Sequence, residues 1–105
     1  MLERARHWQT DYRECAQRHA DARGALRAWQ ADVVESDWAN PLDIKAQYAT
    51  VSIIGGGCVV FDIRGNRYRI VVRVNYQMSL VQVLFAGTYA EYNRLDVARL
   101  CGGAE

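Results

Sequence analysis

The segment RYRIVVRVNY, residues 67–76, alternates polar and apolar side chains along most of its length. Because a β-strand sends successive side chains to opposite faces of its sheet, this pattern predicts a strand with two unlike faces. The apolar face, which should pack against helices, carries Tyr68, Ile70, Val72, Val74 and Tyr76. The other face is interrupted by Val71 alone and carries Arg67, Arg69, Arg73 and Asn75. One face of the sheet is therefore predicted to be covered and the other to be basic.

Three more segments are rich in the β-branched and aromatic residues that favour strands: residues 48–54, 58–64 and 80–86. Turns of glycine and polar residues separate the four strands: residues 55–57, 65–66 and 77–79. Such short connections predict antiparallel pairing between consecutive strands. The sheet is expected to be a meander of about four strands.

The strand predicted at residues 58–64 adds charge to the basic face. The residues that match its apolar side are Val59, Phe61 and Ile63, which places Asp62 and Arg64 on the basic side. Residues 61–76 contain four arginines and one acid, although the whole chain carries a net charge of only +1. A guanidinium can donate two parallel hydrogen bonds to a phosphate, so this row, including Arg73, is a candidate for RNA binding. The alternative is an ordinary solvated face whose arginines pair with nearby acids.

Helical periodicity precedes the strands. Apolar side chains recur every three or four positions at residues 8–19 and 22–33, which predicts two amphipathic helices. Asn40 followed by Pro41 is typical of a helix start and predicts a short helix through Lys45.

A last helix is predicted after the strands, at residues 89–99. Thr88 and Glu91 form a capping-box pattern at its start, and the glycines after Cys101 end it. The fold class is therefore α+β, with two N-terminal helices, an antiparallel sheet and a C-terminal helix.

The composition predicts one globular domain over residues 1–105, because half of the residues are hydrophobic, 24% are charged and only one is proline. No apolar stretch approaches the roughly 20 residues of a membrane span, and the charged N-terminus does not resemble a signal peptide, so we expect a cytoplasmic protein. The three cysteines are odd in number and widely spaced, and we expect them to be reduced. Cys15 and Cys58 are expected in the core, and Cys101 in a loose, exposed tail.

Few side chains can move protons. The histidines, His7 and His19, both lie in the first predicted helix, far from the arginines, which disfavours a ribonuclease with paired histidines; His19 fits a packed or half-buried role. Candidates nearer the arginines are Tyr89, Tyr92, Asp62, Glu91 and Lys45. Glu91 fits a capping role equally well, and Tyr92 fits a core position. The chain contains no phosphate-binding glycine loop, zinc-protease motif or serine-hydrolase motif.

Several blocks resemble the HigB-type toxins of the RelE superfamily: DIKAQY at residues 43–48, VVFDIRGNRYRIVVRVNY at 59–76 and FAGTYAEYNRLD at 85–96. The resemblance extends over roughly residues 19–96. It implies a RelE-like fold and ribosome-dependent cleavage of mRNA in the decoding site. Because preorganised guanidiniums can stabilise the negative charge of the reacting phosphate, we expect no cofactor and no metal. The resemblance also implies a partner, an antitoxin resembling the helix-turn-helix HigA proteins.

The resemblance implies roles for individual residues. Arg69 matches the superfamily's strand arginine that contacts the scissile phosphate, and Arg64 and Arg67 match basic positions around the hairpin. Lys45 lies in the first block as an RNA-contact candidate, and Tyr92 matches a tyrosine of the last block. We therefore expect Arg69, Arg64 and Tyr92 in the catalytic site, together with the residue at position 89.

Two features depart from the family pattern. Tyr89 stands where the family usually carries histidine in GTHAEY, and a tyrosine with a normal pKa of about 10 is a poor base at neutral pH. The N-terminus also lacks the short apolar strand that commonly opens these toxins, so an edge strand is expected to be absent or replaced by helix.

The leading hypothesis is a ribosome-dependent mRNA endonuclease in which Arg64, Arg67 and Arg69 converge on one open side of the sheet. It fails if these side chains are scattered or are buried in pairs with acids inside the chain. A second hypothesis is a catalytically impaired toxin homologue that acts as an antitoxin-binding or regulatory module. A third is an RNA-binding domain that does not cleave RNA.

Overall fold

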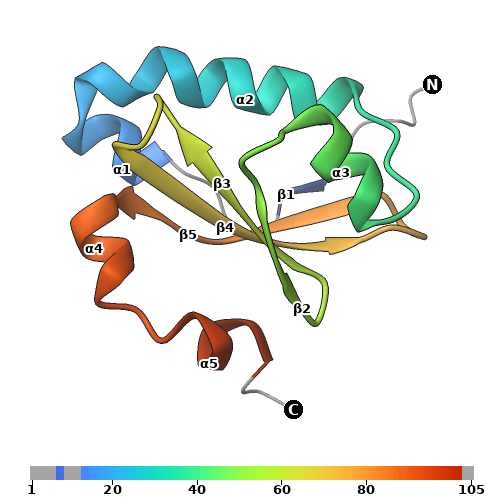
Figure 1. The fold of residues 1–105 in the computed structure, drawn as a ribbon. Coiled ribbons are helices and arrows are strands. Elements are labelled where there is room, and N and C mark those ends of the chain that lie inside the picture. Colours follow the sequence, from blue (N-terminus) through green and yellow to red (C-terminus); the bar gives the residue numbers. More distant parts are fainter. Residues whose placement is uncertain (1–6, 9–12, 103–105) are drawn as a thin grey trace.

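The computed structural model describes residues 7–8 and 13–102. Its elements are β1 (His7–Trp8), α1 (Arg13–Arg18), the 3-10 helix η1 (Ala20–Ala22), α2 (Arg23–Glu35), α3 (Pro41–Gln47), β2 (Ser52–Gly55), β3 (Cys58–Ile63), β4 (Tyr68–Asn75), β5 (Leu80–Thr88), α4 (Tyr89–Asn93) and α5 (Val97–Gly102). Helix α2 lies along one side of the sheet and α5 on the other (Figure 1). The predicted α+β class is confirmed. No described helix combines the length and the apolar character needed to cross a membrane.

The sheet has the strand order β1-β5-β4-β3-β2. The pairs β2–β3, β3–β4 and β4–β5 are antiparallel, as the short turns predict. The prediction for the N-terminus is wrong, because His7 and Trp8 form a strand parallel to Leu80 and Val81 of β5 instead of starting a helix. This pairing covers the start of the free edge of β5, at Leu80 and Val81. Tyr12, also placed in the predicted helix, lies outside the described residues.

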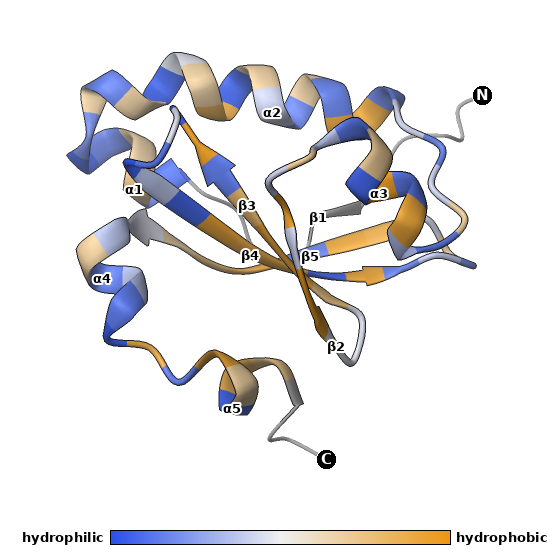
Figure 2. Ribbon diagram, in the orientation of Figure 1, coloured by the Kyte–Doolittle hydropathy of each residue, from blue (hydrophilic) through white to orange (hydrophobic). Residues whose placement is uncertain are grey.

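The first face of the sheet carries the main core. Helix α2 buries Leu26, Trp29 and Val33 against it. Phe61 of β3 lies among aromatic rings, with its ring centroid 5.4 Å from that of Trp29 and 5.0 Å from that of Tyr48. The predicted apolar sides of β3 and β4 both belong to this core, and Figure 2 shows the hydrophobic central parts of these strands.

Local capping explains where α3 begins and β2 starts. The Asn40 side chain accepts a hydrogen bond from the Asp43 N–H at 3.2 Å, and Pro41 is the first helical residue, as predicted. The helix continues to Gln47, and Tyr48 still donates its N–H to the Ile44 carbonyl at 2.8 Å. Strand β2 therefore starts at Ser52, four residues later than the pattern suggested.

The second face of the sheet is partly covered by the C-terminal helices. A second core cluster contains Cys58, Val60, Val71 and Cys101, against which Leu84, Phe85, Tyr92, Val97 and Leu100 pack. The single helix predicted at residues 89–99 is two helices, because Asp96 accepts a hydrogen bond from the Arg99 N–H at 3.1 Å and starts α5. The expectation of an open basic face is therefore wrong, because α5 and part of α4 cover it.

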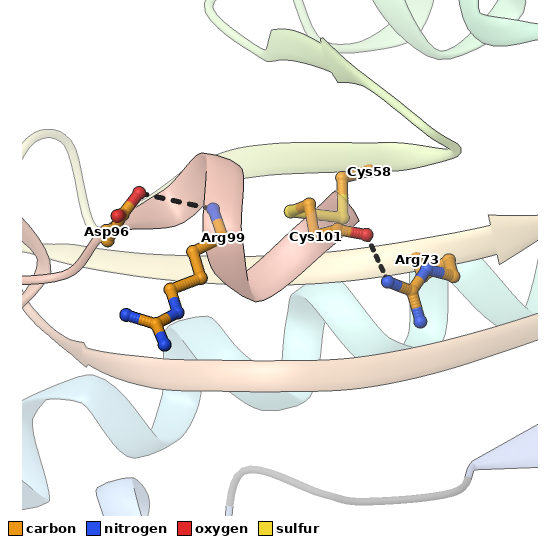
Figure 3. The surroundings of a disulfide bond; sticks show 5 residues. All are labelled: Cys58, Arg73, Asp96, Arg99 and Cys101. Carbon is orange, nitrogen blue, oxygen red and sulfur yellow. Dashed lines mark hydrogen bonds between the residues drawn. A yellow bond between two sulfur atoms is a disulfide. The ribbon is translucent and has the colours of Figure 1, made fainter. Parts of the chain in front are cut away.

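Cys58 and Cys101 form a disulfide (Figure 3). The expectation that they are reduced is wrong, and Cys101 is only 3% exposed instead of lying in a loose tail. The disulfide forms because of a tertiary contact: α5 packs on the second face and brings Cys101 beside Cys58 at the start of β3. Cys15 is free and buried, as expected.

Candidate functional site

Arg69 lies on the second face at the start of β4, directly opposite Asp62 of β3. Its Nε atom is 3.2 Å from Asp62 Oδ1, and its side chain is only 11% exposed. Asn66, in the β3–β4 turn, accepts hydrogen bonds from both terminal nitrogens: from Nη2 to its Oδ1 at 2.9 Å and from Nη1 to its carbonyl at 3.3 Å. The predicted position of Asp62 beside the arginine row is confirmed. The ion pair itself fits the alternative in which the arginines of this face pair with nearby acids, and two neighbours fix the guanidinium.

Two tyrosines of α4 lie against the same guanidinium. The Arg69 Cζ atom is 4.6 Å from the ring centroid of Tyr89 and 5.6 Å from that of Tyr92, within the range of cation–π attraction. Tyr89 is 43% exposed, whereas Tyr92 packs on the second core cluster. The structure thus brings Arg69, Tyr89 and Tyr92 together, with Asp62 and Asn66 beside them. We call these five residues the Arg69 cluster.

A complete capping box positions α4. Thr88 Oγ1 accepts from the Glu91 N–H at 3.1 Å, and Glu91 Oε1 accepts from the Thr88 N–H at 2.9 Å. The Thr88 N–H bond is the largest cause that lowers the pKa of the Glu91 carboxyl, which also lies 3.6 Å from Arg18. The Tyr89 N–H donates to the Arg67 carbonyl at 2.9 Å and joins the helix start to the residue that precedes β4. Glu91 therefore has the capping role, and its lowered pKa makes it a weak base.

Arg64 and Arg67 do not join the Arg69 cluster. Arg64 Nε lies 3.6 Å from Asp21 Oδ2, and Arg67 Nη1 lies 3.2 Å from the same oxygen. Arg64 has a φ of 53° in the turn, and Arg67 precedes the first residue of β4, so strand alternation controls neither side chain. The expectation that three guanidiniums converge on one open side is wrong, and each of the three has an acidic neighbour within the chain.

Arg73 and Lys45 also have partners inside the chain. An Arg73 terminal nitrogen donates to the Cys101 carbonyl (Figure 3), so α5 holds this guanidinium although it lies on the second face as predicted. Lys45 Nζ donates to the Val51 carbonyl at 2.9 Å. Since Lys45 is on α3, whose Ile44 packs into the first core, it supports the chain before β2 and lies away from the Arg69 cluster.

Other candidate groups have structural surroundings. His19 is half-buried with its ring centroid 5.3 Å from that of Tyr68, which confirms its packed role. His7 is described by its backbone alone. Among the described residues no three His, Cys, Asp or Glu side chains lie together as metal ligands. Asn66 was missed in the sequence, where it was interpreted only as part of a turn.

Asp21 gives folding a dependence on acid pH. The Tyr68 hydroxyl, 2.5 Å from Asp21 Oδ1, is the largest cause that lowers the pKa of this carboxyl below 3.8. The stabilisation is complete above the unfolded-state pKa and is lost as pH falls through the lower folded-state pKa. We therefore expect Asp21→Asn to flatten the acid limb of the stability curve, measured as the urea midpoint against pH. Parallel curves for Asp21→Asn and the unmodified chain would show that Asp21 is not responsible.

The meander sheet with helices on its first face agrees with the RelE-like fold that the resemblance implies. A family model described as HigB_toxin, the RelE-like toxic component of a toxin-antitoxin system, matches residues 22–95. The chain belongs to this HigB toxin family. A comparison with curated proteins found no match. The matched region includes the Arg69 cluster and ends before α5.

Proposed function

We propose that this toxin is a ribosome-dependent endoribonuclease that cuts mRNA and inhibits translation in the cytoplasm. The toxin role follows from the family. The observation that carries the proposed activity is the Arg69 cluster, in which a guanidinium of fixed orientation lies beside two phenol rings. Such an arrangement suits an RNA backbone, because guanidinium binds phosphate and aromatic rings stack on bases.

The proposed chemistry is attack of a ribose 2′-oxygen, whose proton passes to solvent water, on the neighbouring phosphorus. The bond from phosphorus to the 5′-oxygen then breaks and leaves a 2′,3′-cyclic phosphate. The five-coordinate phosphorus gains negative charge, which Arg69 would stabilise in place without a metal ion. Tyr89, the exposed tyrosine, would donate its hydroxyl proton to the departing 5′-oxygen. An incoming phosphate would have to compete with Asp62 for the Arg69 guanidinium.

A second candidate function is a toxin homologue with impaired catalysis that still binds its antitoxin. Two observations favour it. Arg69 is ion-paired and only 11% exposed, so it is less available to RNA than an unpaired arginine. Tyr89 also supplies a phenol hydroxyl where the family pattern has the imidazole of histidine.

Induced expression in bacteria distinguishes the two candidates. We expect the unmodified chain to stop growth and translation, and Tyr89→His to leave this arrest in place. Tyr89→Phe keeps the ring against Arg69 but lacks the hydroxyl, so it should slow RNA cleavage about tenfold or more. A harmless unmodified chain together with a toxic Tyr89→His variant would instead support the impaired homologue.

Membership of a toxin-antitoxin family implies an antitoxin partner. We propose that this partner is a HigA-like helix-turn-helix protein encoded in the adjacent reading frame. Co-expression of the neighbouring gene should restore growth, and its product should copurify with the toxin. Persistent arrest, with the toxin purified alone, would argue against this partner.

A further inference from the structure

The disulfide attaches the C-terminal helix to the second face of the sheet. Cys58 is the first residue of β3, and Cys101 lies in the last turn of α5, a helix of six residues. Helices this short are marginal in water without other support. The position of α5 therefore depends on the disulfide, on packing of Val97 and Leu100, and on the Arg73 bond to the Cys101 carbonyl (Figure 3).

The same packing connects α5 with the Arg69 cluster. Tyr92 packs against the second core cluster together with Val97 and Leu100, and its ring centroid is 5.6 Å from the Arg69 Cζ atom. Only residues 94–96 separate α4 from α5. Release of α5 would therefore take Cys101 out of the cluster on which Tyr92 packs and weaken the support of that ring.

We propose that Cys58 and Cys101 form a redox latch, a thiol–disulfide exchange site whose oxidised state holds α5 down and keeps Tyr92 beside Arg69. In the reduced state α5 detaches and Tyr92 loses part of its packing, whereas the capping box still holds the start of α4. The latch lies partly outside the family match, which ends at residue 95. Its effect on RNA cleavage rests on the proposed function, whereas its effect on α5 does not.

The exchange partner is a dithiol reductant. One of its thiolates attacks a protein sulfur, the Cys58–Cys101 bond breaks, and the other protein sulfur leaves as a thiolate and takes up a proton. The second thiol of the reductant then displaces the mixed disulfide, so the reductant is oxidised and both cysteines become thiols. Since Cys58 and Cys101 are 0% and 3% exposed, attack requires fraying of α5 from its C-terminal end.

Amide hydrogen exchange of the full chain tests the latch. Dithiothreitol should speed exchange in residues 97–102 about tenfold or more, because opening of α5 no longer has to occur within a closed covalent loop. The Cys58→Ala/Cys101→Ala variant should exchange fast with or without dithiothreitol. Equal exchange in the oxidised and reduced chains, or alkylation of all three cysteines in unreduced, denatured protein, would overturn the proposal.

Cys15→Ala is the matched control. It removes the one free cysteine. Burial raises the pKa of the Cys15 thiol, so this thiol stays protonated and takes part only slowly in thiol–disulfide exchange. Its α5 should respond to dithiothreitol as the unmodified chain does, and a lost response would overturn the assignment to Cys58 and Cys101.

RNA cleavage on ribosomes tests the effect on the site without any reductant. The Cys58→Ala/Cys101→Ala variant should cleave about tenfold more slowly than the oxidised chain, whereas Cys15→Ala should match it. If the double variant cleaves RNA as fast as the oxidised chain although its α5 amides exchange faster, the proposed effect of the disulfide on activity is overturned. If no form cleaves RNA, the proposed function fails, and hydrogen exchange alone still decides whether the latch exists.

Discussion

Arg69→Ala is expected to abolish growth arrest and to slow mRNA cleavage by about 100-fold or more. A preorganised charge at the reacting phosphate contributes effects of this size, because it needs no reorganisation when negative charge develops. In this chain Asp62 and Asn66 provide that organisation, because they fix the orientation of the planar Arg69 guanidinium. Cleavage rates of purified variants on ribosome-bound mRNA measure the effect.

Two control variants make the Arg69 result interpretable. Arg69→Lys keeps the charge but lacks the planar fork, so it should lose most of the activity as well. Arg27→Ala removes an exposed arginine of α2, a helix on the other side of the sheet, and should cleave at the normal rate. Circular dichroism must show that Arg69→Ala is folded. A folded Arg69→Ala variant that still arrests growth would contradict the assigned site.

Loss of the Cys58–Cys101 disulfide is expected to lower the free energy of unfolding by about 4 kcal/mol. The bond closes a loop with a sequence separation of 43 residues, and opening it restores the entropy of that loop in the unfolded chain. Urea unfolding with and without dithiothreitol measures the difference. Cys15→Ala should retain the full difference, and Cys58→Ala/Cys101→Ala should show none. Equal unfolding free energies for the oxidised and reduced unmodified chain would contradict the expectation.

The sheet could be predicted because its signals are local. Alternation in β3 and β4 assigned each side chain to the correct face, and Asn40 and Thr88 marked the helix starts through bonds to residues three positions away. The break between α4 and α5 had a local signal as well, because Asp96 caps the N–H of Arg99, but residues 89–99 were predicted as one helix from their first cap and the final glycines.

The remaining features depend on tertiary contacts. Pairing of β1 with β5 joins residues more than 70 positions apart, and the disulfide joins β3 to α5, so spacing alone could not reveal either. The candidate site was only partly predictable for the same reason. Strand register places Arg69 opposite Asp62, and this pair could be predicted. Arg64 and Arg67 lie outside the strands and form ion pairs with Asp21, which the strand pattern could not predict.

Mapping the 5′ ends of mRNA after incubation with ribosomes and the purified chain tests the proposed activity most directly. We expect new ends within the codon of the ribosomal decoding site, dependent on ribosomes and absent with Arg69→Ala. Intact mRNA on translating ribosomes, or the same cuts produced by the unmodified chain and by folded Arg69→Ala, would contradict the account.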